Sequence, residues 1–248
     1  MLGKLMKYEI RATGRIFLPL YGLILLSAAI LRGFMAANEK ANNLFTMPIN
    51  ITGTIYFLLI ATVFVMTLVV MIQRFQKNLL SDEGYLSFTL PVKTHSHIDA
   101  KMLVTLIWII LSVLVIILSV FILAVNQNVI LSFEKSYLPF SDWFTSQSWL
   151  FVEYIVLFLV GSLSITLHIY ASMAVGNLCP KHRLLAAFGA FLGFGVIEQI
   201  VATFMAIWRV TSLDDTADLS IVILFAGVFG VAYYFFTDWV LSKKLNLE

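Results

Sequence analysis

The segment Met102–Val125 reads MLVTLIWIILSVLVIILSVFILAV and contains no charged residue. As an α-helix these residues would extend about 36 Å, which is more than the ~30 Å hydrocarbon core of a bilayer. A segment in lipid must also satisfy its own backbone hydrogen bonds, and a helix does so. The segment therefore predicts a membrane-spanning helix.

Further apolar runs of similar length occur along the rest of the chain. They are Ile16–Met35, Ile51–Ile72, Trp149–Val175, Leu184–Trp208 and Ile221–Leu241. Charged residues make up only 12% of the 248 residues, whereas a soluble domain has about 25%, so most of the surface must face lipid. Because the runs are continuous, they exclude the alternating strands of a membrane barrel. The predicted fold class is an all-α integral membrane protein with six transmembrane helices.

The basic residues predict the orientation of these spans. With both termini in the cytoplasm, 12 of the 16 Lys and Arg residues lie in cytoplasmic segments, which is the distribution that the positive-inside rule requires. These twelve are Lys4, Lys7, Arg11, Arg15, Arg74, Lys77, Lys93, Lys101, Lys181, Arg183, Lys243 and Lys244. The net charge is only +2, and no basic cluster with interleaved aromatic residues occurs, so we expect no nucleic-acid partner.

Residues 1–15 form a predicted domain of their own, ahead of the six-span domain 16–248. Their basic side chains recur every three or four residues, which places them on one stripe of a helix. Such an amphipathic helix lies in the headgroup layer of the membrane. Gly14 and Pro19 then predict a bend into the first span. The alternative is that these are ordinary positive-inside charges without regular structure.

A polar insertion, Arg74–Lys101, separates the second and third predicted spans. Ser81 followed by Asp82 and Glu83 is typical of a helix start, and Pro91 predicts its end. A second helix is expected to start at Thr94 or Ser96 and to continue into the third span. The apolar residues between Glu83 and Pro91 would give the short first helix an exposed face, which usually meets a partner.

At this point the sequence resembles a known family. Asn78–Lys101, with its core SDEGYLSFTLPV, is similar to the loop between spans two and three of ABC-2-type transporter permeases. The ending WVLSKKLNLE (Trp239–Glu248) resembles the C-terminus of the small bacterial permeases of that family, such as those of phenol-soluble-modulin exporters. The family's loop carries a coupling helix that docks on a separate ATPase subunit. The alternative is that the loop is an ordinary cytoplasmic linker.

The resemblance implies both a contact site and a function. Within a cytoplasmic coupling loop of residues 73–101, the contact to the ATPase would be made by Asp82, Glu83, Gly84, Tyr85, Leu86 and Phe88. The chain would be the permease subunit of an exporter in the bacterial plasma membrane, moving amphipathic or hydrophobic substrates such as antimicrobial or phenol-soluble-modulin-like peptides. Its partners would be two ATPase copies, membrane lipids and a second permease, either identical or related.

Sequence motifs bear on whether the chain is itself an enzyme. It contains no G-x-x-x-x-G-K-[ST] loop for phosphates, so the resemblance assigns ATP and Mg to the partner ATPase subunit and no cofactor to this chain. An intramembrane protease is disfavoured because H-E-x-x-H is missing and GSLS at 161–164 is not the G-x-S-x-G elbow. We therefore expect a non-catalytic subunit.

Ionisable residues inside the spans are the other candidate site, because each costs about 2.5–3.5 kcal/mol on insertion scales. Glu198 and Arg32 lie about 21 and 24 Å along their spans from the cytoplasmic side, so we predict that they face each other. Two hypotheses stay open. Glu198 lines a translocation path or gate, where it would meet a cationic substrate, or it is structural, either in a buried pair or as a protonated carboxyl bonded to Gln199 or to a neighbouring helix. His168 is expected to make a helix–helix hydrogen bond or to relay protons. A proton-coupled six-span secondary transporter is therefore the alternative function.

Three smaller predictions concern other polar and small residues. Asp238 is expected to pair with Lys243 and Lys244 at the inner end of the last span. His95 and His97 are expected to be solvated. The GxxxG of Gly189 and Gly193 suggests a face for helix packing or dimerisation.

Overall fold

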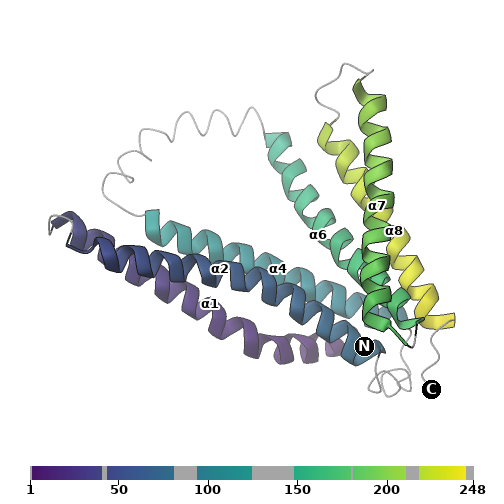
Figure 1. Cartoon of the computed structure of the whole chain (residues 1–248), viewed down its shortest axis with the longest axis horizontal. Coiled ribbons are helices and arrows are strands. Elements are labelled where there is room, and N and C mark those ends of the chain that lie inside the picture. The colour runs from purple at the N-terminus through teal and green to yellow at the C-terminus, as the bar shows by residue number, and fades with distance from the viewer. Residues whose placement is uncertain are drawn as a thin grey trace. The chain divides into compact units, whose positions relative to one another are not determined.

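The computed structural model describes residues 2–40, 44–80, 94–124, 148–179, 181–210 and 218–243. These residues form α1 (Leu2–Lys40), α2 (Thr46–Phe75), a π-helical turn η1 (Gln76–Leu80), α4 (Thr94–Ala124), α6 (Ser148–Asn177), α7 (Arg183–Val210) and α8 (Asp218–Lys243) (Figure 1). Six of the described helices are long and apolar enough to cross a membrane. The all-α class and the six spans predicted from the apolar runs are thus confirmed.

The helices are longer than the apolar runs that predicted them. α4 begins at Thr94, which confirms that a helix starts before the third span and continues through Lys101 into it. α2 likewise passes Ile72 and ends at Phe75, where the wider turn η1 follows. Polar residues continue these helices because backbone hydrogen bonding depends little on whether a side chain is apolar.

α1 is a single helix across the expected boundary at residue 15. Pro19 lies inside it and cannot donate a backbone hydrogen bond to the carbonyl of Arg15; the ribbon of α1 curves in its N-terminal half (Figure 1). The four basic residues of the predicted stripe, Lys4, Lys7, Arg11 and Arg15, are all exposed. That residues 1–15 lie in the membrane surface stays a prediction.

The chain divides into two compact units, which we describe separately. The N-terminal unit comprises Lys7–Val70 and Ile107–Ser148. The C-terminal unit comprises Met1–Met6, Met71–Leu106 and Trp149–Glu248.

Trp108 of α4 organises the packing of the N-terminal unit. Its ring stacks on Phe17 of α1 with 4.7 Å between centroids, and its Nε1 donates a hydrogen bond of 2.7 Å to Thr13 Oγ1. The Tyr21 and Ser112 hydroxyls meet at 2.7 Å one turn further along. The ring edge also lies against Gly14, where an added Cβ would touch it at 3.6 Å. Such interhelical hydrogen bonds and close contacts stabilise helices in lipid, where burial of apolar surface cannot.

The core of the C-terminal unit includes residues just before and just after the segment 81–93. Phe75 stacks on Tyr170 of α6 with 4.1 Å between ring centroids. Leu79 and Leu80 of η1 and Ile98 of α4 are buried in the same cluster. The expected coupling loop is therefore joined at both ends to a packed core.

α6 and α7 meet through a tight turn. The Cys179 carbonyl accepts a hydrogen bond from the His182 amide, and the His182 carbonyl accepts one from Ala186 at the start of α7. A Cβ on Gly176 would come within 2.6 Å of the Arg183 carbonyl oxygen and 2.8 Å of the Ala187 nitrogen. Only a glycine fits between the two backbones at this point. The turn thereby sets how α7 packs against α6, which carries half of the site described next.

Candidate functional site

Three helices of the C-terminal unit each turn one face toward a polar cluster. On α6 the inward positions include Ser164, Leu167, His168 and Ala171, which are spaced as one side of a helix. On α8, a Cβ added at Gly230 would lie 3.5 Å from Ser164, and the same face carries Tyr233. α7 contributes a face carrying Phe191, Phe194 and Glu198. These periodicities bring His168, Glu198 and Tyr233 together from three helices.

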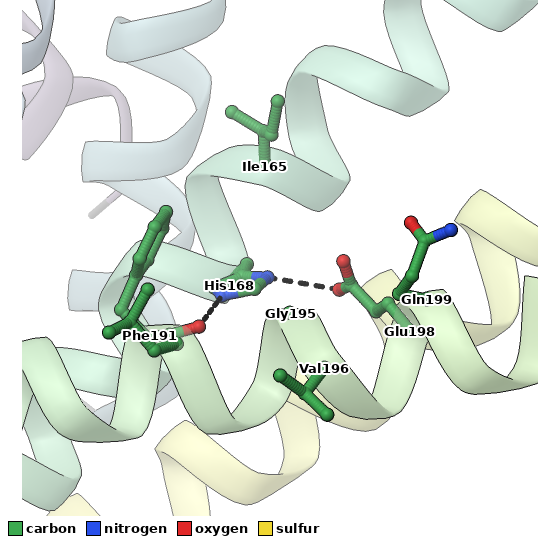
Figure 2. Close-up of a pocket in the computed structure, with 8 residues that line it drawn as sticks. Ile165, His168, Phe191, Gly195, Val196, Glu198 and Gln199 are labelled. Carbon is green, nitrogen blue, oxygen red and sulfur yellow. Dashed lines mark hydrogen bonds and ion pairs between the residues drawn. The ribbon is translucent and has the colours of Figure 1, made fainter.

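Glu198 accepts or shares hydrogen bonds from both neighbouring helices. Its Oε1 lies 2.9 Å from His168 Nδ1 (Figure 2), and the Tyr233 hydroxyl donates to the same oxygen at 2.7 Å. His168 Nε2 lies 3.1 Å from the backbone carbonyl oxygen of Phe191 on α7. His168 thus uses both ring nitrogens to hold α7, which confirms the expectation of a helix–helix hydrogen bond.

This geometry fixes how many protons the His168–Glu198 pair holds. The Phe191 carbonyl can only accept, so His168 Nε2 carries a hydrogen. A contact of 2.9 Å between Nδ1 and Oε1 also requires one hydrogen between the two atoms. Either an imidazolium faces a carboxylate, or a neutral imidazole faces a protonated carboxyl. In both arrangements the pair shares one proton and has no net charge, which lowers the cost of placing it among apolar helices.

Aromatic rings shield the histidine from its surroundings. The His168 ring centroid lies 4.7 Å from that of Phe191, 5.1 Å from Tyr233 and 6.0 Å from Phe194. The His168 side chain is only 7% exposed, while that of Glu198 is 29% exposed. The histidine is therefore an internal group of the unit, and the carboxyl is the member of the pair that other molecules can reach.

A cavity of about 360 Å³ opens beside the exposed side of Glu198. Its walls come from α6 and α7 and are mainly apolar, with Ile165, Leu192 and Val196 among them. His168, Glu198 and Gln199 also line it and supply polar groups (Figure 2). An apolar hollow with a few converging polar groups is the usual form of a small-molecule site.

A second carboxyl of the unit is buried away from this cavity. Glu153 of α6 is buried, and its Oε1 accepts a hydrogen bond of 2.9 Å from the Ser220 hydroxyl of α8. This bond joins α6 to α8, so Glu153 is a structural contact between the two helices.

At the other end of α8, two contacts join it to the first turns of α4. The Tyr234 hydroxyl donates to Asp99 Oδ1 at 2.9 Å, and Asp238 Oδ1 lies 2.7 Å from His95 Nδ1. His95 is a partner of Asp238 that was not predicted, and α4 begins early enough to bring it there. Lys244 lies outside the described residues, so the predicted pairing with Lys243 and Lys244 stays a prediction. His97 is buried, so the expectation that both histidines are solvated was wrong for His97.

The remaining predicted site residues are not brought into this cluster. The coupling residues Asp82, Glu83, Gly84, Tyr85, Leu86 and Phe88 lie outside the described residues. Arg32 belongs to the N-terminal unit, whereas Glu198 takes the two partners described above from its own unit. The pairing of Arg32 with Glu198 therefore stays a prediction.

Sequence reasoning missed Tyr233. A phenolic hydroxyl in the middle of an apolar helix needs a hydrogen-bond partner, and this need was the available signal. The sequence could not show which of the adjacent Tyr233 and Tyr234 would point to Glu198, because the two differ by about 100° around the helix.

Comparisons with known proteins add no relative: no family model matches the chain, and neither the curated proteins nor the solved structures include a match.

Proposed function

We propose that this chain is the membrane-spanning, non-catalytic subunit of a bacterial ABC-2-type exporter. It would move amphipathic or hydrophobic substrates out of the cell, with antimicrobial or phenol-soluble-modulin-like peptides as the best candidates. ATP and Mg would be bound by a separate ATPase present in two copies, and a second permease would complete the assembly. The observation that carries this proposal is the burial of both ends of the coupling loop in the core of the C-terminal unit.

Burial at both ends matters because an exporter of this kind must receive motion from outside the membrane. Leu79 precedes residues 81–93 and Ile98 follows them, and both side chains are fully buried. A displacement of residues 81–93 would therefore act on tightly packed side chains rather than on free linkers. Packed interiors transmit strain because they are close to incompressible. This arrangement suits domain closure by a partner that moves the spans as rigid bodies.

The contacts between α4 and α8 extend the mechanical connection from residues 81–93 further into the unit. Asp99 and His95 lie in the first turns of α4, directly after residues 81–93. They contact Tyr234 and Asp238 of α8, respectively. Tyr234 is next to Tyr233, which donates to Glu198. A shift of the start of α4 would thus be felt by α8 and, through it, by the His168–Glu198 pair. The predicted ATPase contact within residues 81–93 and the His168–Glu198 pair would then both respond to movement of α4, as coupling requires.

The test is copurification of the tagged full-length chain with the ATPase. We expect the wild-type chain to bring an ATPase with it, and the double substitution Tyr85→Ala and Phe88→Ala to reduce its yield about tenfold or more, as loss of central aromatic contacts does. Tyr8→Ala is the matched control, because Tyr8 is an exposed aromatic residue on α1, in the segment predicted to be cytoplasmic. We expect this control to retain the ATPase.

Two results would contradict the proposal. One is a chain that purifies without an ATPase from its native membrane in a mild detergent. The other is equal loss of the ATPase in the Tyr8→Ala control, which would show that the effect does not come from the loop.

A proton-coupled secondary transporter is the second candidate, and the shared proton of His168 and Glu198 favours it. Such a transporter needs no partner. Transport by the purified chain alone in liposomes, driven by a pH gradient and unaffected by ATP, would support it over the exporter.

A further inference from the structure

Within the C-terminal unit, Glu198 uses only one of its two carboxyl oxygens among the residues that the structure describes. The hydrogen bonds with His168 and Tyr233 both end at Oε1. Oε2 has no hydrogen-bond partner among the described residues of that unit. In Figure 2 the second oxygen of Glu198 stands beside the bonded one with no dashed line of its own. An acceptor that stays open at this depth in a span is costly unless something else fills it.

The cavity next to that oxygen is suited to an apolar chain. Ile165, Leu192 and Val196 line it, and each of these side chains is more than half exposed. They belong to α6 and α7, both of which are long and apolar enough to cross a membrane, so an apolar occupant suits the cavity. A volume of about 360 Å³ falls within the ~300–1,000 Å³ of typical small-molecule sites. The occupant must therefore combine an apolar body with a group that a carboxylate prefers.

We propose that this cavity binds the ammonium group of an amphipathic amine, which donates to Glu198 Oε2 while its alkyl part lies along Ile165, Leu192 and Val196. The strength of the hydrogen bond to Oε2 decides between occupants. An anion has no hydrogen to donate and would be repelled by the carboxyl oxygens, and an alcohol would donate only a neutral hydrogen bond, whereas an ammonium donates a charge-assisted bond that is about twice as strong. The proposal specifies the substrate class of the proposed exporter and in that respect rests on it, but binding itself is a property of this chain alone.

Binding of the amine also requires a proton to leave. The empty pair shares one proton and is neutral, so an added ammonium would leave a net positive charge among apolar helices. The charge is removed when the shared proton departs to water. His168 then stays neutral, with its Nε2 hydrogen on the Phe191 carbonyl, and Glu198 is an ionised carboxylate that receives Tyr233 at Oε1 and the ammonium at Oε2. His168 Nδ1 and Glu198 Oε1 are then both acceptors with no hydrogen between them, so their 2.9 Å contact is given up when the proton leaves. One ammonium enters and one proton leaves, so charge and protons balance.

The titratable groups that face Glu198 come from each helix packed around it. They are His168 of α6 and Tyr233 of α8 among the described residues. Lower pH favours retention of the shared proton, because proton and amine compete for the same carboxylate. Amine affinity should therefore fall as the pH is lowered.

Binding is tested with radiolabelled hexylamine and the full-length chain in lipid nanodiscs. Hexan-1-ol is the neutral competitor of the same length. We expect saturable hexylamine binding that excess hexan-1-ol does not displace. Glu198→Gln should weaken binding by about tenfold or more, which corresponds to the loss of a hydrogen bond to a charged group.

Two further variants separate loss of the site from loss of folding. Glu153→Gln is the matched control, because Glu153 is a buried carboxyl of the same unit that pairs with Ser220 outside the cavity; it should bind within about twofold of wild type. Val196→Trp fills the cavity from an exposed position and leaves both residues of the pair in the sequence. It should abolish binding while leaving the melting temperature unchanged.

Proton release is followed with a pH-indicator dye in weakly buffered solution. We expect proton release on addition of hexylamine, none with hexan-1-ol, and none with Glu198→Gln.

Three results would contradict the proposal. Hexylamine binding without proton release would overturn the exchange of proton for ammonium. Hexylamine affinity that is equal in wild type and Glu198→Gln would overturn the binding site. So would crosslinking of Val196→Cys between two copies, in a Cys179→Ser background, that forms to the same extent with and without excess hexylamine, because a second copy would then occupy the cavity. None of these measurements involves the ATPase, so their outcome is separate from that of copurification.

Discussion

His168 is the residue whose removal should disturb the C-terminal unit most directly. Both of its ring nitrogens are bonded to α7, and its side chain is only 7% exposed. His168→Ala removes both bonds and leaves Glu198 short of a partner, so we expect a loss of roughly 1–3 kcal/mol of stability. His182→Ala should change stability by less than about 0.5 kcal/mol, because His182 is exposed. Equilibrium unfolding in mixed micelles measures both.

A double-mutant cycle shows whether the effect comes from the pair. We expect His168→Ala and Glu198→Gln together to cost less than the sum of the single changes, with an interaction of about 0.5–3 kcal/mol. Additive effects would contradict a direct bond between the two side chains.

At this scale the sequence identified which residues are unusual but not their partners. The cost of ionisable groups in lipid singled out His168 and Glu198, and the structure joins them. Depth along a span can be counted from the sequence, which is why Arg32 was matched to Glu198. The rotation of a helix about its axis cannot be counted in this way, and that rotation is what turns Glu198 toward α6 and α8.

Among the elements, the α6–α7 turn depends on one glycine. A methyl group on Gly176 would lie 2.5 Å from Ala187 Cβ and 2.6 Å from the Arg183 carbonyl oxygen. Because two of the three nearest atoms are backbone, the helices must move apart, and we expect Gly176→Ala to cost about 1–3 kcal/mol. Gly161→Ala on the same helix has open space and should be neutral or stabilise by up to about 1 kcal/mol. Equal melting temperatures for the two variants would contradict the close approach.

The N-terminal unit offers a similar comparison between two threonines. Thr13→Val keeps the side-chain shape but leaves Trp108 Nε1 without its acceptor in a buried position, so we expect a loss of about 1–3 kcal/mol. Thr54→Val is the control, because the exposed Thr54 hydroxyl bonds only to the Asn50 carbonyl of its own helix. Thermal unfolding in detergent, followed by tryptophan fluorescence, should separate the two. A Thr13→Val melting temperature no lower than that of the control would count against the bond.

The elements themselves were largely predictable because every span is an apolar run of sufficient length. The ends of the helices were less predictable. Polar residues such as those of Thr94–Lys101 extend α4 without any change in backbone hydrogen bonding, and hydropathy does not register them. The same limit explains α1, where Pro19 suggested a separation but helical turns continue on both sides of it.

For the whole molecule, the orientation predicted from the basic residues can be tested with its own single cysteine. Cys179 is exposed at the α6–α7 turn, which the charge distribution places in the cytoplasm. A membrane-impermeant maleimide should therefore label Cys179 in inverted vesicles and not in intact cells. Leu44 is exposed between α1 and α2, on the predicted outer side, so Cys179→Ser combined with Leu44→Cys should give the reverse pattern. Labelling of Cys179 from outside the cell would invert all six spans, place residues 81–93 beyond the reach of any ATPase, and leave the amine site as the only part of the proposed function still standing.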